Sequence, residues 1–189
     1  MAFKILLLNQ KGGVGKTTLA DELSFALERR GFSVAFISTD PQGGQVHELC
    51  TDPYVAEMCD FQVIDTAGVL KKDMDTWCKA ADLILVPVLP SPRDFEPTLR
   101  TMEVIDASQT QAEVYVVLNF YYSYGILDRY LLEYFGQKGI AVLGKIPRTV
   151  TLSQAAAAGK SVAEFAPYSS AVPILEEMTE QILVLREES

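Results

Sequence analysis

Residues Asn9–Thr18 read NQKGGVGKTT, a glycine-rich stretch with two lysines. It follows an apolar run, Phe3–Leu8, and precedes a helical pattern, so we expect a glycine-rich turn between a strand and a helix. Such a turn leaves several backbone N–H groups unpaired at the positive end of a helix dipole, which favours phosphate binding. The ammonium group of Lys16 can then reach the β- and γ-phosphates of a nucleotide, and the hydroxyl of Thr17 can hold Mg²⁺. The predicted phosphate-binding residues are Gly12, Gly13, Val14, Gly15, Lys16, Thr17 and Thr18.

A second lysine distinguishes this turn from the general pattern G-x-x-x-x-G-K-[ST]. Gln10 stands where that pattern has its first glycine, and Lys11 follows it directly. The stretch KGGVGKT resembles the deviant Walker A motif, KGGxGKT, of the ParA/MinD group of P-loop ATPases. The resemblance implies that Lys11 reaches across a nucleotide-sandwich dimer and touches the phosphates held by the partner subunit. The competing interpretation is a glycine turn with a solvated lysine.

Strand and helix patterns alternate along the rest of the chain. After the glycine turn, apolar residues recur at helical spacing up to Gly31, a typical helix stop. The expected strands are Phe3–Leu8, Ser33–Thr39, Phe61–Ile64, Asp82–Val88, Glu113–Leu118 and Ile140–Ile146. Further helices are expected over Thr98–Ala107, Ile126–Phe135, Ala155–Ala158 and from about Pro173 onward. We therefore predict an α/β P-loop NTPase fold, with a mostly parallel, twisted sheet and helices on both faces in three α/β/α layers, as one domain over residues 1–189.

Two carboxylates follow predicted strands, at the edge where open α/β sheets bind ligands. Asp40 can orient the attacking water or a Mg²⁺-bound water, or it can simply start a turn before Pro41. The sequence DPQ also resembles the second motif of the family, in which this aspartate is needed for hydrolysis. Asp65 matches a Walker B carboxylate, which holds Mg²⁺ through water. The predicted metal-site residues are Thr17, Asp40 and Asp65, and the predicted catalytic residues are Lys11, Lys16 and Asp40.

Later stretches resemble the small plasmid partition ATPases of the same family. LPSPRDF, Leu89–Phe95, resembles a segment of the family's dimer interface, and its two prolines predict a rigid exit from the sheet. The run from Ile146 onward, IPRTVTLSQ, resembles a motif near the adenine. The resemblance implies that Asn119 hydrogen-bonds the adenine edge and that Pro147 contacts adenine through its backbone. For Asn119, an ordinary polar residue at a strand end remains the alternative.

Composition restricts the partners. The chain has 16 Lys and Arg against 25 Asp and Glu, a net charge of −9, which disfavours a general nucleic-acid binder. No apolar run approaches the length of a membrane-spanning helix, no secretory signal is visible, and the final helix is too acidic to bind anionic lipid. Three cysteines without a C-x-x-C pair indicate reduced thiols in a cytoplasmic protein.

The resemblance implies an ATPase that binds ATP and Mg²⁺, forms a homodimer with ATP and hydrolyses it slowly as a timer. The implied cargo is plasmid DNA, chromosomal DNA or a protein complex, and a ParB-like or other partner protein stimulates hydrolysis. Nonspecific DNA is a further implied partner, against which the net charge argues, and no membrane is expected. Two alternatives remain: a MinD-like positioning ATPase on a membrane, and a metabolic ATP-dependent ligase or phosphotransferase on the same fold.

Overall fold

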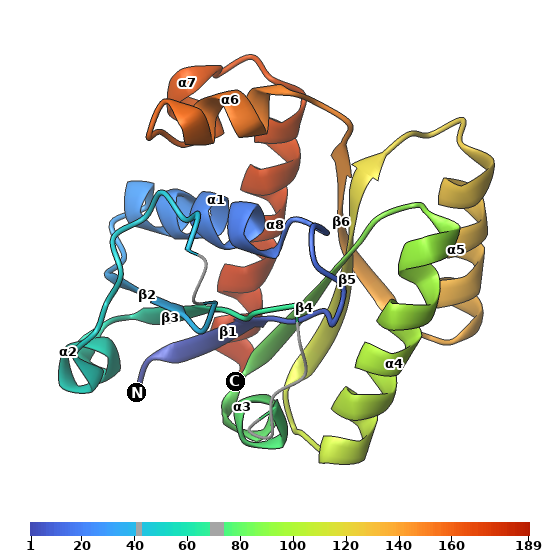
Figure 1. Ribbon diagram of the computed structural model, residues 1–189. Coiled ribbons are helices and arrows are strands. Elements are labelled where there is room, and N and C mark those ends of the chain that lie inside the picture. The colour runs from blue at the N-terminus through green and yellow to red at the C-terminus, as the bar shows by residue number, and fades with distance from the viewer. Residues whose placement is uncertain (41–42, 69–73) are drawn as a thin grey trace.

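The computed structural model describes residues 1–40, 43–68 and 74–189 (Figure 1). Within these residues, parallel strands form one six-stranded sheet in the order β2-β3-β1-β4-β5-β6. The strands are β1 (Phe3–Leu7), β2 (Val34–Ser38), β3 (Phe61–Asp65), β4 (Leu83–Val88), β5 (Glu113–Tyr121) and β6 (Ala141–Pro147).

Helices cover both faces of this sheet, as Figure 1 shows. Helices α1 and α8 pack on one face, and α3, α4 and α5 pack on the other. The helices are α1 (Lys16–Arg29), α2 (Pro53–Met58), α3 (Met74–Ala80), α4 (Pro92–Ser108), α5 (Ile126–Gln137), α6 (Thr151–Ala157), α7 (Val162–Phe165) and α8 (Ala171–Glu188). The predicted three-layer α/β/α architecture is therefore confirmed.

The central strand β1 shows why the sheet needs helices on both sides. Its successive side chains point to opposite faces, and residues on both faces are apolar. Ile5 and Leu7 join the core shared with α1 and α8, whereas Leu6 joins the core shared with α3, α4 and α5. All three are fully buried, as expected for a strand in the middle of a parallel sheet.

The order of the strands places the glycine turn at the centre of one sheet edge. β1 lies between β3 and β4, so the chain leaves β1 toward one side of the sheet and later returns to build the other side. In an open α/β sheet, the crevice at such a reversal of strand order is the usual ligand site. The segments that follow β1, β2, β3 and β4 meet at this edge.

The predicted start of α4, end of β5 and start of α6 were wrong. The two prolines after β4 do not extend an exit from the sheet, because Pro92 is the first residue of α4 and Ser91 caps that helix by accepting a hydrogen bond from the Arg93 N–H. Strand β5 continues to Tyr121, so Asn119 lies within the strand and not after it. The short helix α6 begins at Thr151, four residues before the predicted start at Ala155.

Parts of the chain had no predicted structure or lie outside the description. The structure adds the short helices α2, α3 and α7, which the sequence analysis did not predict. Pro41 and Gln42 of the predicted DPQ motif lie outside the described residues. Among the helices that are described, none has the length and apolar character needed to cross a membrane.

Candidate nucleotide-binding site

The turn between β1 and α1 adopts the geometry of an anion-binding loop. Gly13 and Gly15 have φ angles of 78° and 92°, in the left-handed region that favours glycine. Gly15 caps α1 without a side-chain hydrogen bond, and the first turn of the helix carries no acidic residue. The N–H groups at the start of this helix therefore face the crevice with the positive end of the helix dipole behind them.

Lys16 occupies the position expected of the lysine that holds phosphate. Its side chain is almost fully buried, and its Nζ donates a hydrogen bond to the backbone carbonyl of Lys11 at 3.3 Å. Burial lowers the pKa of Lys16, while the negative charges of Asp65 and Asp40 oppose this shift. A cation that is desolvated in the free protein is poised to gain from an anionic ligand, because the ligand supplies the missing counter-charge.

Thr17 and Asp65 form the second part of the site. The Thr17 hydroxyl donates to Asp65 Oδ2 at 2.7 Å, and Asp65 Oδ1 is buried without a hydrogen-bond partner among the described residues. Burial raises the pKa of Asp65 to about 6, although the Thr17 hydrogen bond and the Lys16 charge act in the opposite direction. A buried carboxylate oxygen that lacks a donor, next to a hydroxyl, fits the hydrated Mg²⁺ predicted from the sequence.

The loops after β2 and β3 are tied to each other and to the glycine turn. The Ala67 N–H donates to the Thr39 hydroxyl at 3.2 Å, and the Thr39 N–H donates to the Asp65 carbonyl at 2.9 Å. A β-carbon on Gly68 would lie 3.0 Å from the backbone nitrogen of Gly12, so glycine is required for this close approach. Asp40 follows Thr39 directly and borders the same cavity as Lys16.

One cavity of about 370 Å³ brings most of the predicted residues together. It joins the glycine turn and Asp40 to Asn119 of β5 and Pro147 of β6, which come from distant parts of the sequence. It also includes residues that the sequence analysis did not assign. The lining residues are Gly12, Gly13, Gly15, Lys16, Thr17, Thr18, Asp40, Gly68, Asn119, Phe120, Pro147, Thr149, Leu152 and Ser153.

Asn119 braces the glycine turn. Its Nδ2 donates to the Val14 carbonyl at 2.9 Å, and its Oδ1 accepts from the Phe120 N–H at 2.9 Å. A β-carbon on Gly15 would overlap the Asn119 amide, so the asparagine and the turn fit each other closely. The contact with an adenine edge stays a prediction, and the hydrogen bond to Val14 adds a structural role that the sequence did not suggest.

The Lys11 side chain lies against the first turn of α4. Its Nζ lies 3.6 Å from Oδ1 of Asp94, a buried carboxylate in the first turn of α4. The Lys11 side chain is 40% exposed, and Lys11 is not among the described residues that line the cavity. The two lysines of the motif therefore differ sharply, because Lys16 is enclosed in the site and Lys11 lies at its outer side.

Buried hydroxyls of α4 hold the backbone just before Lys11. The Asn9 side chain donates to the Pro87 carbonyl at 2.8 Å and to the Thr98 hydroxyl at 3.1 Å, and its Oδ1 accepts from the Lys11 N–H. The Gln10 N–H donates to the Thr101 hydroxyl at 3.0 Å. Helix α4 thus fixes the backbone of the motif and also supplies the carboxylate that pairs with Lys11.

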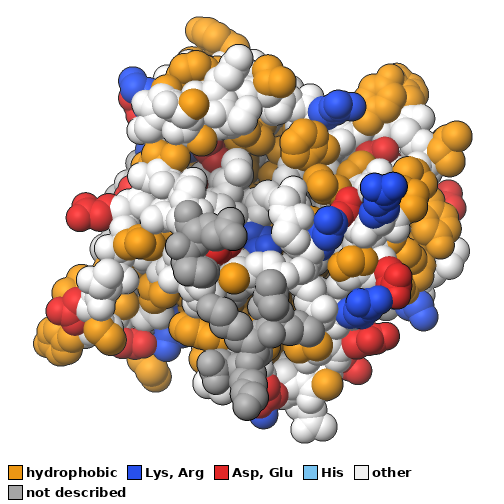
Figure 2. All heavy atoms as spheres, in the orientation of Figure 1, with side chains coloured by type: hydrophobic (Ala, Val, Ile, Leu, Met, Phe, Trp, Pro, Cys, Tyr) orange, Lys and Arg blue, Asp and Glu red, His pale blue; other side chains and the backbone are white. Residues whose placement is uncertain are grey.

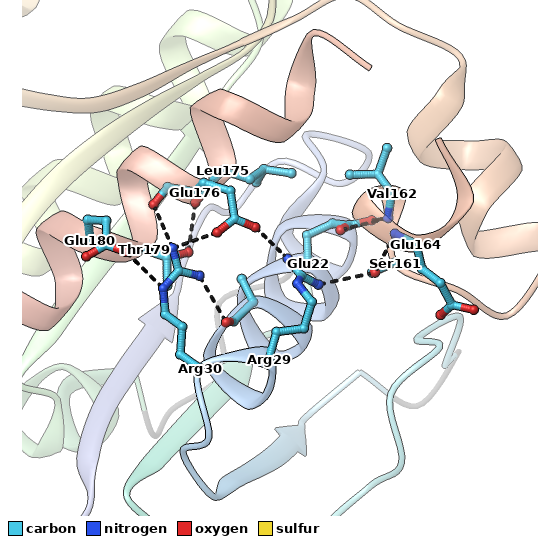
Figure 3. A network of polar contacts seen from close by, with 11 residues as sticks. Glu22, Arg29, Arg30, Ser161, Val162, Glu164, Leu175, Glu176, Thr179 and Glu180 are labelled. Carbon is cyan, nitrogen blue, oxygen red and sulfur yellow. Dashed lines mark hydrogen bonds and ion pairs between the residues drawn. The ribbon is translucent and has the colours of Figure 1, made fainter. Parts of the chain in front are cut away.

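Hydrogen bonds from α1 hold Ser161 and Val162, in the segment that follows β6. Figure 3 shows Glu22 and Arg29 of α1 directed toward the segment around α7, and Arg30 directed toward α8. The two carboxylate oxygens of Glu22 accept the Val162 N–H at 2.9 and 3.0 Å, and Arg29 donates to the Ser161 hydroxyl at 3.2 Å. Arg30 pairs with glutamates of α8 at 2.6 and 2.8 Å.

The buried carboxylate of Glu22 predicts a pH dependence of the free energy of unfolding. Burial raises the pKa of Glu22 from 4.5 to about 7, while the Val162 hydrogen bonds and the Arg29 charge oppose the shift. Between these two pH values the folded protein binds a proton that the unfolded chain releases. The contribution of protonated Glu22 to the free energy of unfolding is therefore complete below pH 4.5 and is lost as the pH rises through about 7.

Glu22→Gln removes the titrating group and keeps an acceptor for Val162. We expect the wild-type melting temperature to fall by about 2–4 °C more than that of the variant between pH 5 and pH 8, on the order of 1 kcal/mol.

Differential scanning fluorimetry of both proteins across this pH range measures the difference. Glu103→Gln, at an exposed position of α4, is the matched control and should follow the wild-type curve. Parallel curves for wild type and Glu22→Gln would show that Glu22 does not titrate in this window.

Comparison with known proteins identifies the family. Residues 5–162 match the model of the CobQ/CobB/MinD/ParA nucleotide binding domain. Maintenance of carboxysome distribution protein A of Halothiobacillus neapolitanus is 33% identical over 133 residues, which cover 57% of this chain and 60% of that protein. The chain therefore matches less than two thirds of the length of this relative.

Solved structures share the fold at low sequence identity. The McdA of Cyanothece, in its apo form and as the ATP complex of a variant, gives TM-scores of 0.82 and 0.79 at 14% and 15% identity. These alignments cover 97% of this chain and 100% and 96% of the McdA chains. The septum site-determining protein MinD of Pyrococcus horikoshii, complexed with Mg-ADP, gives a TM-score of 0.75 at 16% identity over 96% of each chain. These structures show the shared fold, and the match over residues 5–162 shows that this chain belongs to the CobQ/CobB/MinD/ParA family of nucleotide-binding domains.

Proposed function

We propose that this protein is a Mg²⁺-dependent ATPase that dimerises around ATP and uses slow hydrolysis to time the positioning of a cargo. The observation that carries the proposal is the contrast between the two lysines. Lys16 is buried in the phosphate cavity, whereas Lys11 is half-exposed and held by Asp94 outside that cavity. A lysine in this position is available to the nucleotide of a second subunit, which is the role implied by the resemblance.

Different residues of the site bind ATP and promote its hydrolysis. The backbone of the glycine turn and Lys16 bind the phosphates, and Thr17 with Asp65 would hold the Mg²⁺. When bound with the nucleotide, Mg²⁺ supplies positive charge to the phosphate oxygens. Asp40 orients the attacking water, and Lys11 from the second subunit stabilises the charge that develops on the γ-phosphate. Loss of that phosphate removes the contacts that hold the dimer together, and the subunits separate.

The relatives support a role in intracellular positioning. One is named for maintaining the distribution of carboxysomes, and another is a septum site-determining protein. We propose that the cargo here is likewise a protein complex or a plasmid or chromosome, and that a partner protein stimulates hydrolysis. An electrophoretic shift on nonspecific DNA with ATP and with ADP, over a salt series, separates a DNA cargo from a protein cargo, because phosphate contacts give a salt-dependent affinity.

Asp40→Ala tests the hydrolytic half of the proposal. The variant keeps the glycine turn, Lys16 and Thr17, so it should bind ATP at least as tightly as wild type and form the dimer. Without the carboxylate that orients water, we expect the rate of phosphate release to fall by about 100-fold or more and the ATP dimer to persist. Phosphate release and light scattering measure the two effects.

Asp75→Ala, which removes an exposed carboxylate of α3, is the control and should hydrolyse ATP at the wild-type rate. Wild-type turnover in Asp40→Ala would show that Asp40 has only the turn-forming role left open by the sequence.

A further inference from the structure

The starts of α4 and α5 and the loop before α5 carry exposed aromatic side chains and arginines. Figure 2 shows Lys and Arg side chains next to hydrophobic side chains, with Asp and Glu side chains between them, on the part of the surface over α4 and α5. We call the residues Arg93, Tyr122, Tyr124, Ile126, Arg129 and Tyr130 the aromatic–cationic face. Its apolar members are 52–80% exposed, far more than the side chains of a buried core. Exposed large apolar side chains that cluster on one part of a surface are typical of an interaction site.

The loop that displays the tyrosines is held in place from within. The buried carboxylate of Asp128 accepts the Tyr122 N–H at 2.7 Å, and the Gly125 N–H donates to the Tyr122 carbonyl at 2.8 Å. The rings of Tyr122 and Tyr124 contact each other with centroids 5.8 Å apart. A rigid display of exposed aromatic rings lowers the entropic cost of binding a partner.

A pocket next to these rings is suited to one apolar side chain. It has a volume of about 170 Å³ between the first turns of α4 and α5, and its lining includes Pro92, Phe95, Leu127 and Tyr130. The rings of Phe95 and Tyr130 meet edge to face at 5.8 Å, so they fix its wall. A pocket of this kind between two helices accepts an anchor residue of a peptide.

The arginines of this region differ from those elsewhere in the chain. Arg29, Arg30, Arg100 and Arg186 each form an ion pair with a carboxylate. By contrast, Arg93, Arg129 and Arg148 are exposed, and none of them has an ion pair within the described ranges 1–40, 43–68 and 74–189. Arg148 adjoins the tyrosine loop, because its N–H donates to the Tyr121 carbonyl at 3.3 Å.

We propose that the aromatic–cationic face docks an acidic segment of a partner protein and that one apolar side chain of this segment enters the pocket between α4 and α5. Unpaired arginines on a protein of net charge −9 are complementary to carboxylates. The apolar pocket favours a peptide over DNA, which has no aliphatic anchor to place there. Its concave shape between two helices also favours a peptide over a membrane surface.

The aromatic–cationic face lies close to the Lys11–Asp94 ion pair, so docking of a partner would affect the nucleotide-binding site. The same first turn of α4 contains Pro92 in the pocket and Asp94, which pairs with Lys11. Pro92, Arg93 and Phe95 also belong to the segment Leu89–Phe95, which resembles part of the family's dimer interface, so a docked partner would compete with the second subunit of the proposed ATP dimer. This regulatory consequence rests on the proposed function, whereas docking itself does not.

Selection from a phage-displayed library of random peptides tests the docking. The immobilised protein carries no nucleotide, and the double variant Arg93→Glu/Arg129→Glu serves for counter-selection. We expect enriched peptides with several Asp or Glu residues around an aromatic or aliphatic anchor. By fluorescence anisotropy, a selected peptide should bind the double variant and Tyr130→Ala at least about tenfold more weakly than wild type. Lys138→Glu, an exposed charge reversal at the far end of α5, should bind it normally.

Each other outcome overturns the proposal. These outcomes are the absence of patch-dependent peptides, enrichment of basic peptides, and displacement of the peptide by duplex DNA or by anionic phosphatidylserine vesicles. Thermal melting of the variants shows that they fold, since all substituted residues are exposed. ATP binding by the wild type is measured separately, so failure of docking is distinguishable from failure of the proposed ATPase function.

Discussion

Lys16→Ala is expected to weaken ATP binding by about 30-fold or more. In the free protein, Lys16 is buried at the cavity, and its charge is opposed only in part by Asp65 and Asp40. The variant loses the cation that faces the phosphates and leaves the two carboxylates to repel them. Loss of one charged partner in a desolvated site costs about 2–5 kcal/mol, so the Kd for ATP should rise by about 30-fold or more. Titration calorimetry with Mg-ATP measures this change.

The same substitution should not weaken the fold. Because burial lowers the pKa of Lys16, the free protein bears a desolvation cost that alanine relieves. We therefore expect the melting temperature of the free variant to equal or exceed that of wild type. Lys79→Ala, at an exposed position of α3, is the control for the loss of one lysine. Unchanged ATP affinity in Lys16→Ala would remove this residue from the phosphate site.

Lys11→Ala is expected to separate binding from dimerisation. The Lys11 side chain does not line the cavity of its own chain, so the variant should bind ATP with nearly wild-type affinity. Without a cation to place against the opposite nucleotide, two negatively charged phosphate groups face each other across the interface. We expect no ATP-dependent dimer and a fall in hydrolysis of about 100-fold or more, comparable to the loss of a charge-stabilising donor in an active site.

A control must separate the loss of the dimer in Lys11→Ala from a loss of stability of the fold. Substitution leaves the buried carboxylate of Asp94 without its 3.6 Å partner. The double variant Lys11→Ala/Asp94→Asn removes that unpaired charge, and it should also remain monomeric with ATP. Normal ATP-dependent dimers of Lys11→Ala, measured by light scattering, would exclude this lysine from the interface.

The sequence predicted the parts of the site whose chemistry needs particular residues at a fixed spacing. The glycine turn is one such part, because its φ angles at Gly13 and Gly15 and the reach of Lys16 permit few alternatives. Asp40 and Asp65 were predicted because polar residues directly after buried strands stand out from the apolar pattern. The sheet and its two covering layers followed from the alternation of strand and helix patterns.

Contacts between distant segments account for what the sequence did not show. Nothing local indicates that Asp94 is buried and holds Lys11, since the pair joins the start of α4 to the turn after β1. The predicted strand Glu113–Leu118 ends three residues before the observed end of β5 at Tyr121. The pairing of β5 with β6 shifts register between Leu118 and Tyr121, where Phe120 has a φ angle of 55°. Such an irregularity leaves no periodic signal in the sequence.

The start of α4 was missed although a signal was present. Ser91 followed by Pro92 is a typical helix cap and first residue, but the prolines were interpreted as a rigid loop. The tyrosines after β5 carried no pattern to which a role could be assigned. Their exposure and the pocket beside them depend on the position of α4 next to α5, which no local pattern in the sequence specifies.

In the proposed mechanism, two copies of this protein close on ATP, with Lys11 of each subunit directed to the nucleotide of the other. Size-exclusion chromatography with light scattering, in Mg²⁺ with either a nonhydrolysable ATP analogue or ADP, tests it most directly. We predict twice the protomer mass of 20.8 kDa with the analogue and 20.8 kDa with ADP. A mass of 20.8 kDa in both, under conditions where calorimetry shows that the analogue is bound, would contradict the account.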